Sequence, residues 1–414
     1  MRGGRLAGVG AALAATFLAC LAWAPASHAA QTPLVVWASP TSAAVLQEQF
    51  ADGYQGRPVQ VVVKAPESLV SDLGATPVEA TPDVIEMPHR LVGTLAVAQS
   101  IVPISVSPKV AARFAPQVWR GFTPSDLTYG MPVMVSNAAL LTNATLVPTQ
   151  PTGFSALADG ALALVNAGKA KVPLAIGQSP TGDGTLTYPL FSALGGYFLG
   201  STDTGAVDVT NVGLANSTFI ANTPIITEWN TSRLLRSSIT PERARDLFVK
   251  GRTPYWIAPV SELDAIMKLT FSYRITAVPP VVAGRDAAPL LDMTGFAMTR
   301  WAEQHGVAED AASFVATGLS RKGIQSALAT AGRRVPALVS AQQAMATTGE
   351  AARLRAFLQA GTKGVAAPSV PQQAELIALG GGAWLESTAG TAATKPKPTF
   401  KKAQAQAELL MGIQ

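Results

Sequence analysis

Cysteine and histidine are nearly absent from this chain of 414 residues. Cysteine occurs once, at Cys20, and only His89 and His305 follow residue 30. Two histidines give no convincing metal site or Ser-His-Asp triad, so we expect no metal and no cofactor. No phosphate loop of the Gly-x-x-x-x-Gly-Lys-Ser/Thr type occurs, and Gly177-Gln-Ser179-Pro lacks the second glycine of a nucleophile elbow. These absences argue against an enzyme.

Charged residues are also few, at 14% against 48% hydrophobic residues. Lysine and arginine number 31 and the acids 26, so removing Arg2 and Arg5 with the first 30 residues leaves 29 − 26 = +3. Such a weak, scattered positive charge gives no reason to expect nucleic acid as a partner. The length exceeds one compact core and suits two lobes, and we expect a monomer.

Residues 1–30 have the pattern of a secretory signal peptide. Arg2 and Arg5 form a basic start, and Leu6 to Trp23 is apolar or small without a charge. Pro25 breaks this run, and small residues suited to cleavage follow at 27–30. The chain is therefore expected to leave the cytoplasm, for the periplasm or the cell surface. The alternative is an uncleaved membrane anchor; no later segment is long and apolar enough to span a bilayer.

Cys20 lies inside this segment. Phe17-Leu18-Ala19-Cys20 resembles a bacterial lipobox, in which the cysteine receives lipid, but Phe17 and Leu18 depart from the usual residues. Cys20 is therefore a candidate lipidation site, and an ordinary cysteine of a signal peptide is the alternative. If cleavage follows Ala30, the mature chain has no cysteine and no disulfide.

Strands and helices alternate in the first part of the chain. The strands expected are residues 34–37, 59–63 and 82–86, and the helices are 44–50 and 92–99. This alternation predicts a mostly parallel sheet in an α/β fold, with ligands beyond the carboxyl ends of its strands. Candidate ligand-binding residues at those ends are Ser39, Glu86, His89 and Arg90. A solvated loop with a local ion pair is the alternative for His89 and Arg90.

The second part of the chain repeats the pattern. Strands are expected at 172–176 and 253–258, and helices at 186–199 and 241–250, where Thr240 is a plausible N-cap. Candidate ligand-binding residues around these strands are Asp183, Thr185, Tyr188, Trp256, Ser261 and Glu262. Alternatives are turn formation for Asp183, packing at the start of a helix for Tyr188, and the core for Trp256.

The last third of the chain is expected to cross between the two lobes twice. Crossings are expected at 275–280 and 332–338, with a strand at 294–298 between them. Helices are expected at 308–319, 351–358, 374–379 and 401–410. Gly380 to Gly382 is expected to form a turn, and 387–398 a low-complexity linker.

Residues 126–151 contain the most informative pattern. Tyr129-Gly130-Met131-Pro132 opens a strand that breaks at Ser136-Asn137, and a second apolar run, 138–141, follows directly. A strand interrupted in this way can pass from one lobe to another. The segment, which ends in Asn143 and Leu146-Val-Pro148, resembles the hinge strand of maltose-type extracellular solute-binding proteins of bacterial ABC importers.

The resemblance extends over nearly all of residues 31–414, in the same order. It includes 34–37, Thr81-Pro-Asp83-Val-Ile, Pro189 to Tyr197, Gly332 to Leu338 and Pro368-Ser-Val-Pro371. It implies a two-lobed, type II periplasmic-binding-protein fold with three crossings. One lobe is then residues 31–135 plus 280–336, and the other is 139–278 plus 339–414.

The resemblance also implies a function. It is delivery of an oligosaccharide similar to malto-oligosaccharides to an ABC permease, by hinged closure. Ser136 stands where such receptors often have an acid, and Met87 near where they often have a tryptophan. The usual aromatic rings that stack on sugars are mostly missing. Alternatives are therefore a receptor for a solute other than sugar and a diverged surface or sensing protein that does not transport.

Overall fold

The computed structural model describes residues 31–203, 205–389, 393 and 395–413. Thr32 onward forms one compact unit. The expected signal peptide, Cys20 and part of the expected linker at 387–398 lie outside the described residues. Within the described part of the chain, no helix is long and apolar enough to cross a membrane.

The first sheet has the strand order β12-β4-β11-β3-β1-β2, and β13 pairs with β11 beside it. β1, β2 and β3 are parallel, as predicted, whereas β11 runs antiparallel to β3 and β4. Its strands are β1 (Leu34–Ala38), β2 (Val59–Val63), β3 (Val84–Pro88), β4 (Met131–Ser136), β11 (Leu290–Met298), β12 (Val335–Pro336) and β13 (Val365–Ala366).

Helices from two distant parts of the chain pack around this sheet and close one hydrophobic core with it. Trp37, Phe122, Phe296 and Phe314 are buried in that core. The helices are α1 (Pro40–Gln49), α2 (Leu69–Ala75), α3 (Val92–Val97), α4 (Pro108–Ala111), α5 (Pro116–Arg120), α11 (Trp301–Gln304), α12 (Ala308–Ser313), α13 (Lys322–Ala331) and α14 (Val339–Gln343). Short 3-10 turns (Pro66–Ser68, Val78–Ala80, His89–Leu91 and Pro124–Asp126) and a π-helical turn (Phe314–Gly318) join them.

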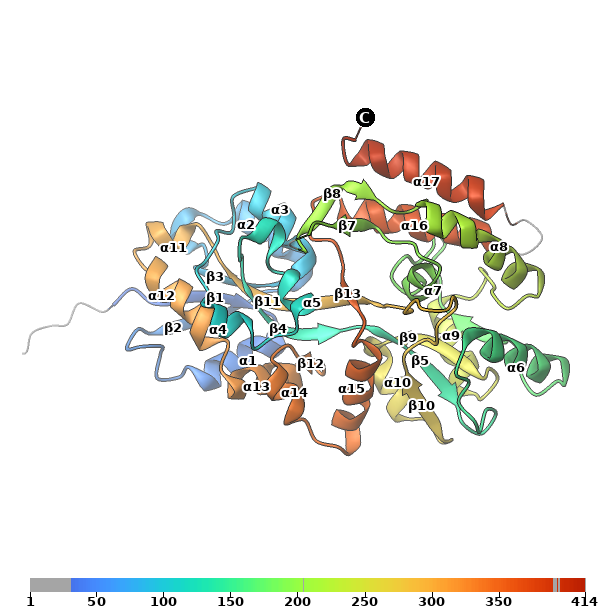
Figure 1. Cartoon of the computed structure of the whole chain (residues 1–414). Coiled ribbons are helices and arrows are strands. Elements are labelled where there is room, and N and C mark those ends of the chain that lie inside the picture. The colour runs from blue at the N-terminus through green and yellow to red at the C-terminus, as the bar shows by residue number, and fades with distance from the viewer. Residues whose placement is uncertain (1–30, 204, 390–392, 394, 414) are drawn as a thin grey trace, which may run out of the picture. The chain divides into compact units, whose positions relative to one another are not determined.

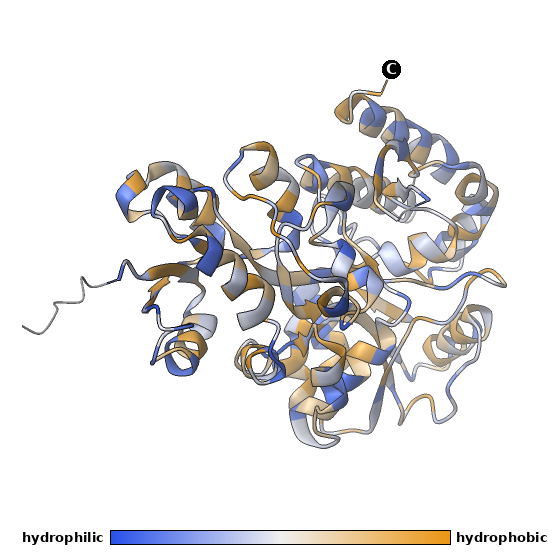
Figure 2. Ribbon diagram, turned by 60° about the vertical axis from the view of Figure 1, so that its left-hand side comes forward, coloured by the Kyte–Doolittle hydropathy of each residue, from blue (hydrophilic) through white to orange (hydrophobic). Residues whose placement is uncertain are grey.

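The second sheet has the order β10-β5-β9-β6 and is covered on both faces. Alternate residues of β5 point to opposite faces, so Leu140 joins one core cluster and Leu141 the other. The strands are β5 (Ala138–Asn143), β6 (Leu174–Ile176), β9 (Tyr255–Pro259) and β10 (Tyr273–Thr276). In Figure 2 the helices change between hydrophilic and hydrophobic along their length, as expected for helices with one buried face.

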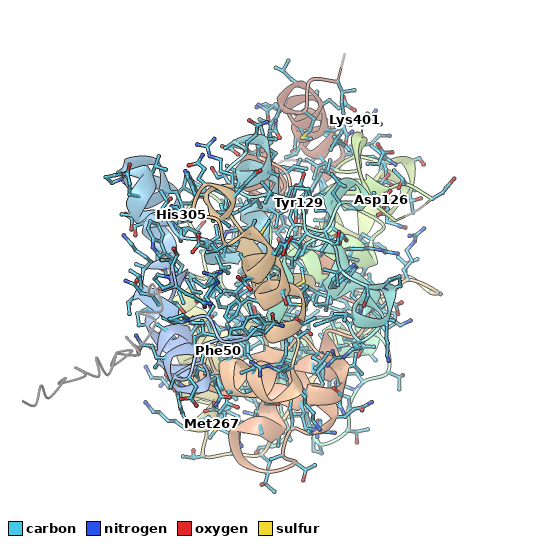
Figure 3. All side chains as sticks on the ribbon, turned by 90° about the vertical axis from the view of Figure 1, so that its left-hand side faces the viewer. Phe50, Asp126, Tyr129, Met267, His305 and Lys401 are labelled. Atoms are coloured by element: carbon cyan, nitrogen blue, oxygen red, sulfur yellow. The ribbon has the colours of Figure 1, made fainter. Side chains whose placement is uncertain are left out.

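The helices on the first face of this sheet are α6 (Phe154–Asn166), α7 (Tyr188–Ala193), α8 (Ser217–Thr231), α16 (Gln373–Ser387) and α17 (Pro396–Leu410). On the other face are α9 (Pro241–Val249), α10 (Leu263–Met267, after the 3-10 turn Val260–Glu262) and α15 (Gly349–Ala360). Lys401 on α17 and Met267 on α10 accordingly lie at opposite ends of the view in Figure 3. A hairpin of β7 (Leu199–Ser201) and β8 (Val207–Val212) completes the described elements.

Most elements lie where the sequence predicts them, but three expectations are wrong. Ile275 and Thr276 do not cross: they belong to β10 and pair with Leu141 and Leu140 of β5. The chain passes between the sheets later, at β11, where Leu290 packs in the second core and Leu291 in the first. The pairing of 275–276 with β5 shows that these residues belong to the second sheet. The sequence pattern of one strand does not reveal its pairing partner.

The other two corrections concern glycines. The helix expected at 186–199 ends at Ala193, because Gly195 has a φ of +96°, which breaks the helix. Gly380 to Gly382 form no turn but continue α16, which is longer than expected. A Cβ on Gly380 would lie 2.6 Å from the ring of Phe198, so the glycine permits a close approach that offsets its poor helix propensity.

His305 and Asp83 form a largely buried ion pair in the first core. The carboxylate of Asp83 accepts from Nδ1 of His305 at 2.7 Å and from the backbone N–H of Val35 at 2.7 Å. Nε2 of His305 lies 3.0 Å from the carbonyl oxygen of Val78, so both ring nitrogens face acceptors. Burial lowers the pKa of His305, but its hydrogen bonds to Asp83 and Val78 and the charges of Asp83 and Glu79 raise it overall.

We expect His305→Gln to destabilise the protein by about 1–3 kcal/mol at pH 6, because the buried carboxylate loses a charged partner. The folded pKa of His305 is raised above its unfolded value of about 6.5. The stabilisation is therefore fully present below that pH and is lost as pH rises through the folded pKa. Urea unfolding at pH 6 and pH 9 should show the gap between native protein and variant shrinking. Lys250→Gln, which removes an exposed pair with Asp246, is the control and should cost below about 0.5 kcal/mol at both pH values.

Candidate functional site

The carboxyl ends of strands from both sheets meet at the place where the chain passes between them. β4 runs on into β5 with only Asn137 between them (Figure 1). Ser136 at the end of β4 pairs with Asp292 on β11. Two residues further, Pro88 at the end of β3 pairs with Thr294. Pro259 at the end of β9 pairs with Ala138, the first residue of β5. Ligands of open α/β sheets bind at such strand ends.

His89 is fully buried at this point and holds three segments together. Its Nδ1 accepts from the backbone N–H of Met293 on β11 at 3.1 Å, and its Nε2 donates to the carbonyl oxygen of Ala367 at 3.1 Å. Both ring nitrogens are therefore used by the backbone. The prediction that His89 contacts ligand is corrected: burial and these bonds give it a structural role.

Three charged side chains and one hydroxyl lie together at the crossing, and we call them the crossing cluster: Arg90, Asp292, Arg334 and Ser136. Nη1 of Arg90 lies 3.7 Å from Oδ1 of Asp292, and Ser136 donates to the backbone oxygen of Asp292 at 3.4 Å. Burial raises the pKa of the Asp292 carboxyl, but the adjacent His89 ring and the charges of Arg90 and Arg334 lower it overall. Arg90 and Asp292 keep about half of their side-chain surface exposed, at 49% and 52%. They are thus charged groups available to a solute.

Sequence reasoning placed Arg90 and Ser136 here but missed Asp292 and Arg334. A signal for Asp292 was present, because it is the single charged residue within the apolar run from Leu290 to Met298. For Arg334 the signal was weak. It belongs to the loop expected to cross between the lobes, but only the pairing of β12 with β4 places it beside Ser136.

Ser39 and Glu86 lie together at the ends of β1 and β3. The carboxylate of Glu86 accepts from the backbone N–H of Ser39 and from the hydroxyl of Ser42, both at 2.7 Å. Glu86 is 8% exposed, so its oxygens serve the start of α1 and not a solute, which corrects its predicted role. Ser39 is half-buried and caps α1, with its side chain accepting from Ser42.

Asp183 and Thr185 lie in a loop that is packed directly on α16. Oδ1 of Asp183 accepts from the backbone N–H groups of Thr185 and Leu186, at 2.9 and 2.8 Å. A Cβ on Gly182 would fall 2.1 Å from the carbonyl oxygen of Gly381, and one on Gly184 2.3 Å from that of Ile377. The bonds of Asp183 are those of the turn alternative, and its half-buried carboxylate is already engaged. Thr185 is exposed.

The remaining candidates divide between core and surface. Trp256 is 2% exposed and packs on Phe248, so the core alternative holds and its predicted role as a sugar platform is corrected. Tyr188 is 5% exposed and stacks on Phe198. Ser261 is exposed beside the end of β9. The carboxylate of Glu262 accepts from Nε and Nη2 of Arg245 at 2.5 and 2.7 Å, so it is already paired with an arginine of α9.

The described residues contain no group of three or more His, Cys, Asp or Glu side chains placed to hold a metal ion. The site therefore offers hydrogen bonds and charges at fixed strand ends. Such an arrangement can bind and orient a polar solute.

Comparisons with known proteins bear on the family and the fold. Residues 46–356 match a family described as bacterial extracellular solute-binding protein. The chain is similar to the galactooligosaccharide-binding protein of Bacillus subtilis (strain 168), with 20% identity over 271 residues. That match covers 64% of this chain and spans only 63% of the relative's length. The structure is similar to the crystal structure of a cyclo/maltodextrin-binding protein complexed with maltotetraose, with a TM-score of 0.77 and 20% identity. It covers 92% of this chain and 97% of the other.

The packing of the 182–184 loop on α16 gives a stability prediction. We expect Gly182→Ala to destabilise the protein by more than about 2 kcal/mol, because its φ of +89° is strained for alanine and the new methyl meets Gly381. Gly284→Ala is the matched control, since Gly284 has a φ of +77° and no atom within 4 Å of its Cβ. Its cost should stay at about 1–2 kcal/mol. Equal midpoints for the two variants in urea unfolding would contradict the proposed close contact.

Proposed function

Since the chain belongs to the bacterial extracellular solute-binding proteins, we propose that it captures an oligosaccharide at the crossing cluster and presents it to an ABC importer. The fold is that of the type II periplasmic-binding proteins, as predicted. Family and fold are those of binding proteins, and the family is extracytoplasmic. The observation that carries the proposal is the meeting of β3, β9 and two crossing strands at Ser136 and Asp292.

The proposed mechanism is closure of two lobes, one built on the first sheet (up to Ser136 and from Leu291 to the end of α14) and one built on the second sheet (from Ala138 to Leu290 and from α15 on). The backbone between Ser136 and Ala138 and the start of β11 absorb the rotation, because these are the short links between the two cores. A solute that contacts both lobes favours the closed arrangement by its differential affinity. The closed, loaded form then docks on the permease.

Arg90 and Asp292 are the proposed recognition groups. Their charges lie at the strand ends, half exposed, and hydrogen bonds between a charged group and a sugar hydroxyl are worth about 1.5–3 kcal/mol. Exclusion of water on closure strengthens them. Ser261, exposed beside the end of β9, supplies a hydroxyl from the other sheet.

Oligosaccharide is the proposed solute class because both named relatives carry it in their names or bound ligand. A second candidate is a polar solute other than sugar, either transported or sensed by a diverged receptor. It is favoured by the enclosure of Trp256 and Tyr188, which leaves neither predicted ring exposed as a platform. We propose no catalysis, and a monomeric receptor in either case.

A ligand screen separates the two candidates. Maltodextrins and galacto-oligosaccharides at millimolar concentration should raise the melting temperature, because a ligand at 100 times its Kd stabilises by about 2.7 kcal/mol. Differential scanning fluorimetry with these sugars, amino acids and polyamines is the measurement. A shift with amino acids or polyamines and none with sugars would reject the oligosaccharide proposal.

Asp292→Asn should weaken solute binding about tenfold, by loss of one charge-assisted hydrogen bond. Asp286→Asn is the control, since Asp286 is exposed earlier in the same segment and its nearest cation is Lys363 at 3.7 Å. Calorimetric titration with the best sugar from the screen measures both, with melting temperatures to verify folding. Unchanged affinity in the Asp292 variant would remove this residue from the site.

Lipid attachment at Cys20 is proposed as the anchor of the secreted chain. Cys20→Ser should then abolish incorporation of labelled palmitate and release the protein from membranes. Absence of labelling from the native protein would favour a cleaved signal peptide, and labelling that persists in the variant would place the lipid elsewhere than at Cys20.

A further inference from the structure

A cavity lies beside the crossing but is lined by none of the residues of the crossing cluster. Its volume is about 420 Å³, within the range of small-molecule sites. α5 supplies Gln117 and Arg120 on one side, and the region of the β7–β8 hairpin supplies Tyr197, Phe198 and Asn211 on the other. Leu290 and the segment 365–369 also line it.

Tyr188 gives this cavity an unused hydrogen-bonding group. The residue lines the cavity, is only 5% exposed, and its ring is fixed by stacking on Phe198 at 5.2 Å between centroids. No hydrogen bond of its hydroxyl occurs among the residues that the structure describes, and the hydroxyl oxygen is not fully enclosed by protein. A hydroxyl that lines a cavity without a protein partner is free to bond to a ligand there.

The charge of the cavity has one sign. Arg120 is the only charged residue in its lining, and no carboxylate pairs with it in the described part of the chain. A Cβ on Gly205 would lie 2.6 Å from Nη2 of Arg120, so the glycine lets the guanidinium lie against the hairpin backbone. An exposed guanidinium without a partner is suited to a carboxylate, which it can bind through two parallel hydrogen bonds.

The remaining lining suits a hydroxylated ring. The hydroxyl of Tyr197 donates to Oδ1 of Asn211 at 2.8 Å, which fixes the tyrosine ring at the cavity edge. The amide of Gln117 donates to the backbone oxygen of Thr362, leaving its own oxygen as an acceptor. Rings, amides and hydroxyls around one guanidinium form a surface for a saturated ring with hydroxyls and one acidic group.

We propose that this cavity is a second binding site, which takes a sugar acid of the uronate class. The carboxylate pairs with Arg120, and the Tyr188 hydroxyl bonds to the ring oxygen or a hydroxyl. The site shares no residue with the crossing cluster, so either proposal can fail without the other.

Calorimetric titration of the mature chain with D-glucuronate, and with D-glucose as the neutral counterpart, tests the site. We expect glucuronate to bind with a millimolar or lower Kd and glucose at least tenfold more weakly. Arg120→Gln should weaken glucuronate binding at least tenfold, and Tyr188→Phe, which keeps the stacked ring, about threefold to tenfold. Lys109→Gln removes an exposed positive charge outside the cavity and should leave the Kd unchanged.

Two controls distinguish the uronate site from the crossing cluster. Asp292→Asn should leave glucuronate binding intact, and saturating oligosaccharide should not displace glucuronate. The proposal is overturned if 10 mM glucuronate gives no heat of binding to the native protein, if Arg120→Gln binds as well as native protein, or if only Asp292→Asn loses the ligand. Melting temperatures within a few degrees of native establish that the variants fold.

Discussion

The buried imidazole of His89 is the contact on which the arrangement of the crossing depends. It belongs to the turn after β3, yet it bonds to Met293 on β11 and to Ala367 beyond β13. Three segments far apart in sequence are thereby fixed at one point. Removing the ring would leave a buried backbone N–H and a carbonyl oxygen without partners, which costs about 1–3 kcal/mol for each group.

The position of His89 also sets the electrostatics of the exposed cluster. The His89 ring, Arg90 and Arg334 all lie near the Asp292 carboxyl and lower its pKa against the effect of burial. Two guanidiniums near one carboxylate leave an excess of donors at the strand ends. Such donors match sugar hydroxyls and acidic solutes alike, so the charge alone does not choose between the solute classes.

Much of the fold could be predicted from the sequence, because its strands are short apolar runs with clear ends. The break at Ser136-Asn137 was a local signal, and the structure places the passage from β4 to β5 there. The return crossing was not a local signal, because the sequence of 275–276 does not reveal that these residues pair with β5, and only the pairing of β11 with β4 shows that the chain crosses at 290–292. The residues of the candidate site also include some that local sequence predicts and some that it does not. Arg90 follows a strand end in sequence, whereas the burial of His89 and Trp256 depends on neighbours from distant segments.

Glycine determines what space the second lobe leaves for a solute. Gly182, Gly184 and Gly381 bring the loop after β6 into backbone contact with α16, where any side chain would hold the two apart. The polar groups of the loop therefore stabilise its own turn, in which Asp183 accepts hydrogen bonds from Thr185 and Leu186. In the proposed site, recognition from this lobe falls to exposed groups such as Ser261, and the charged groups come from the first sheet and the crossing strands. We therefore expect the affinity of that site to depend chiefly on Asp292 and Arg90.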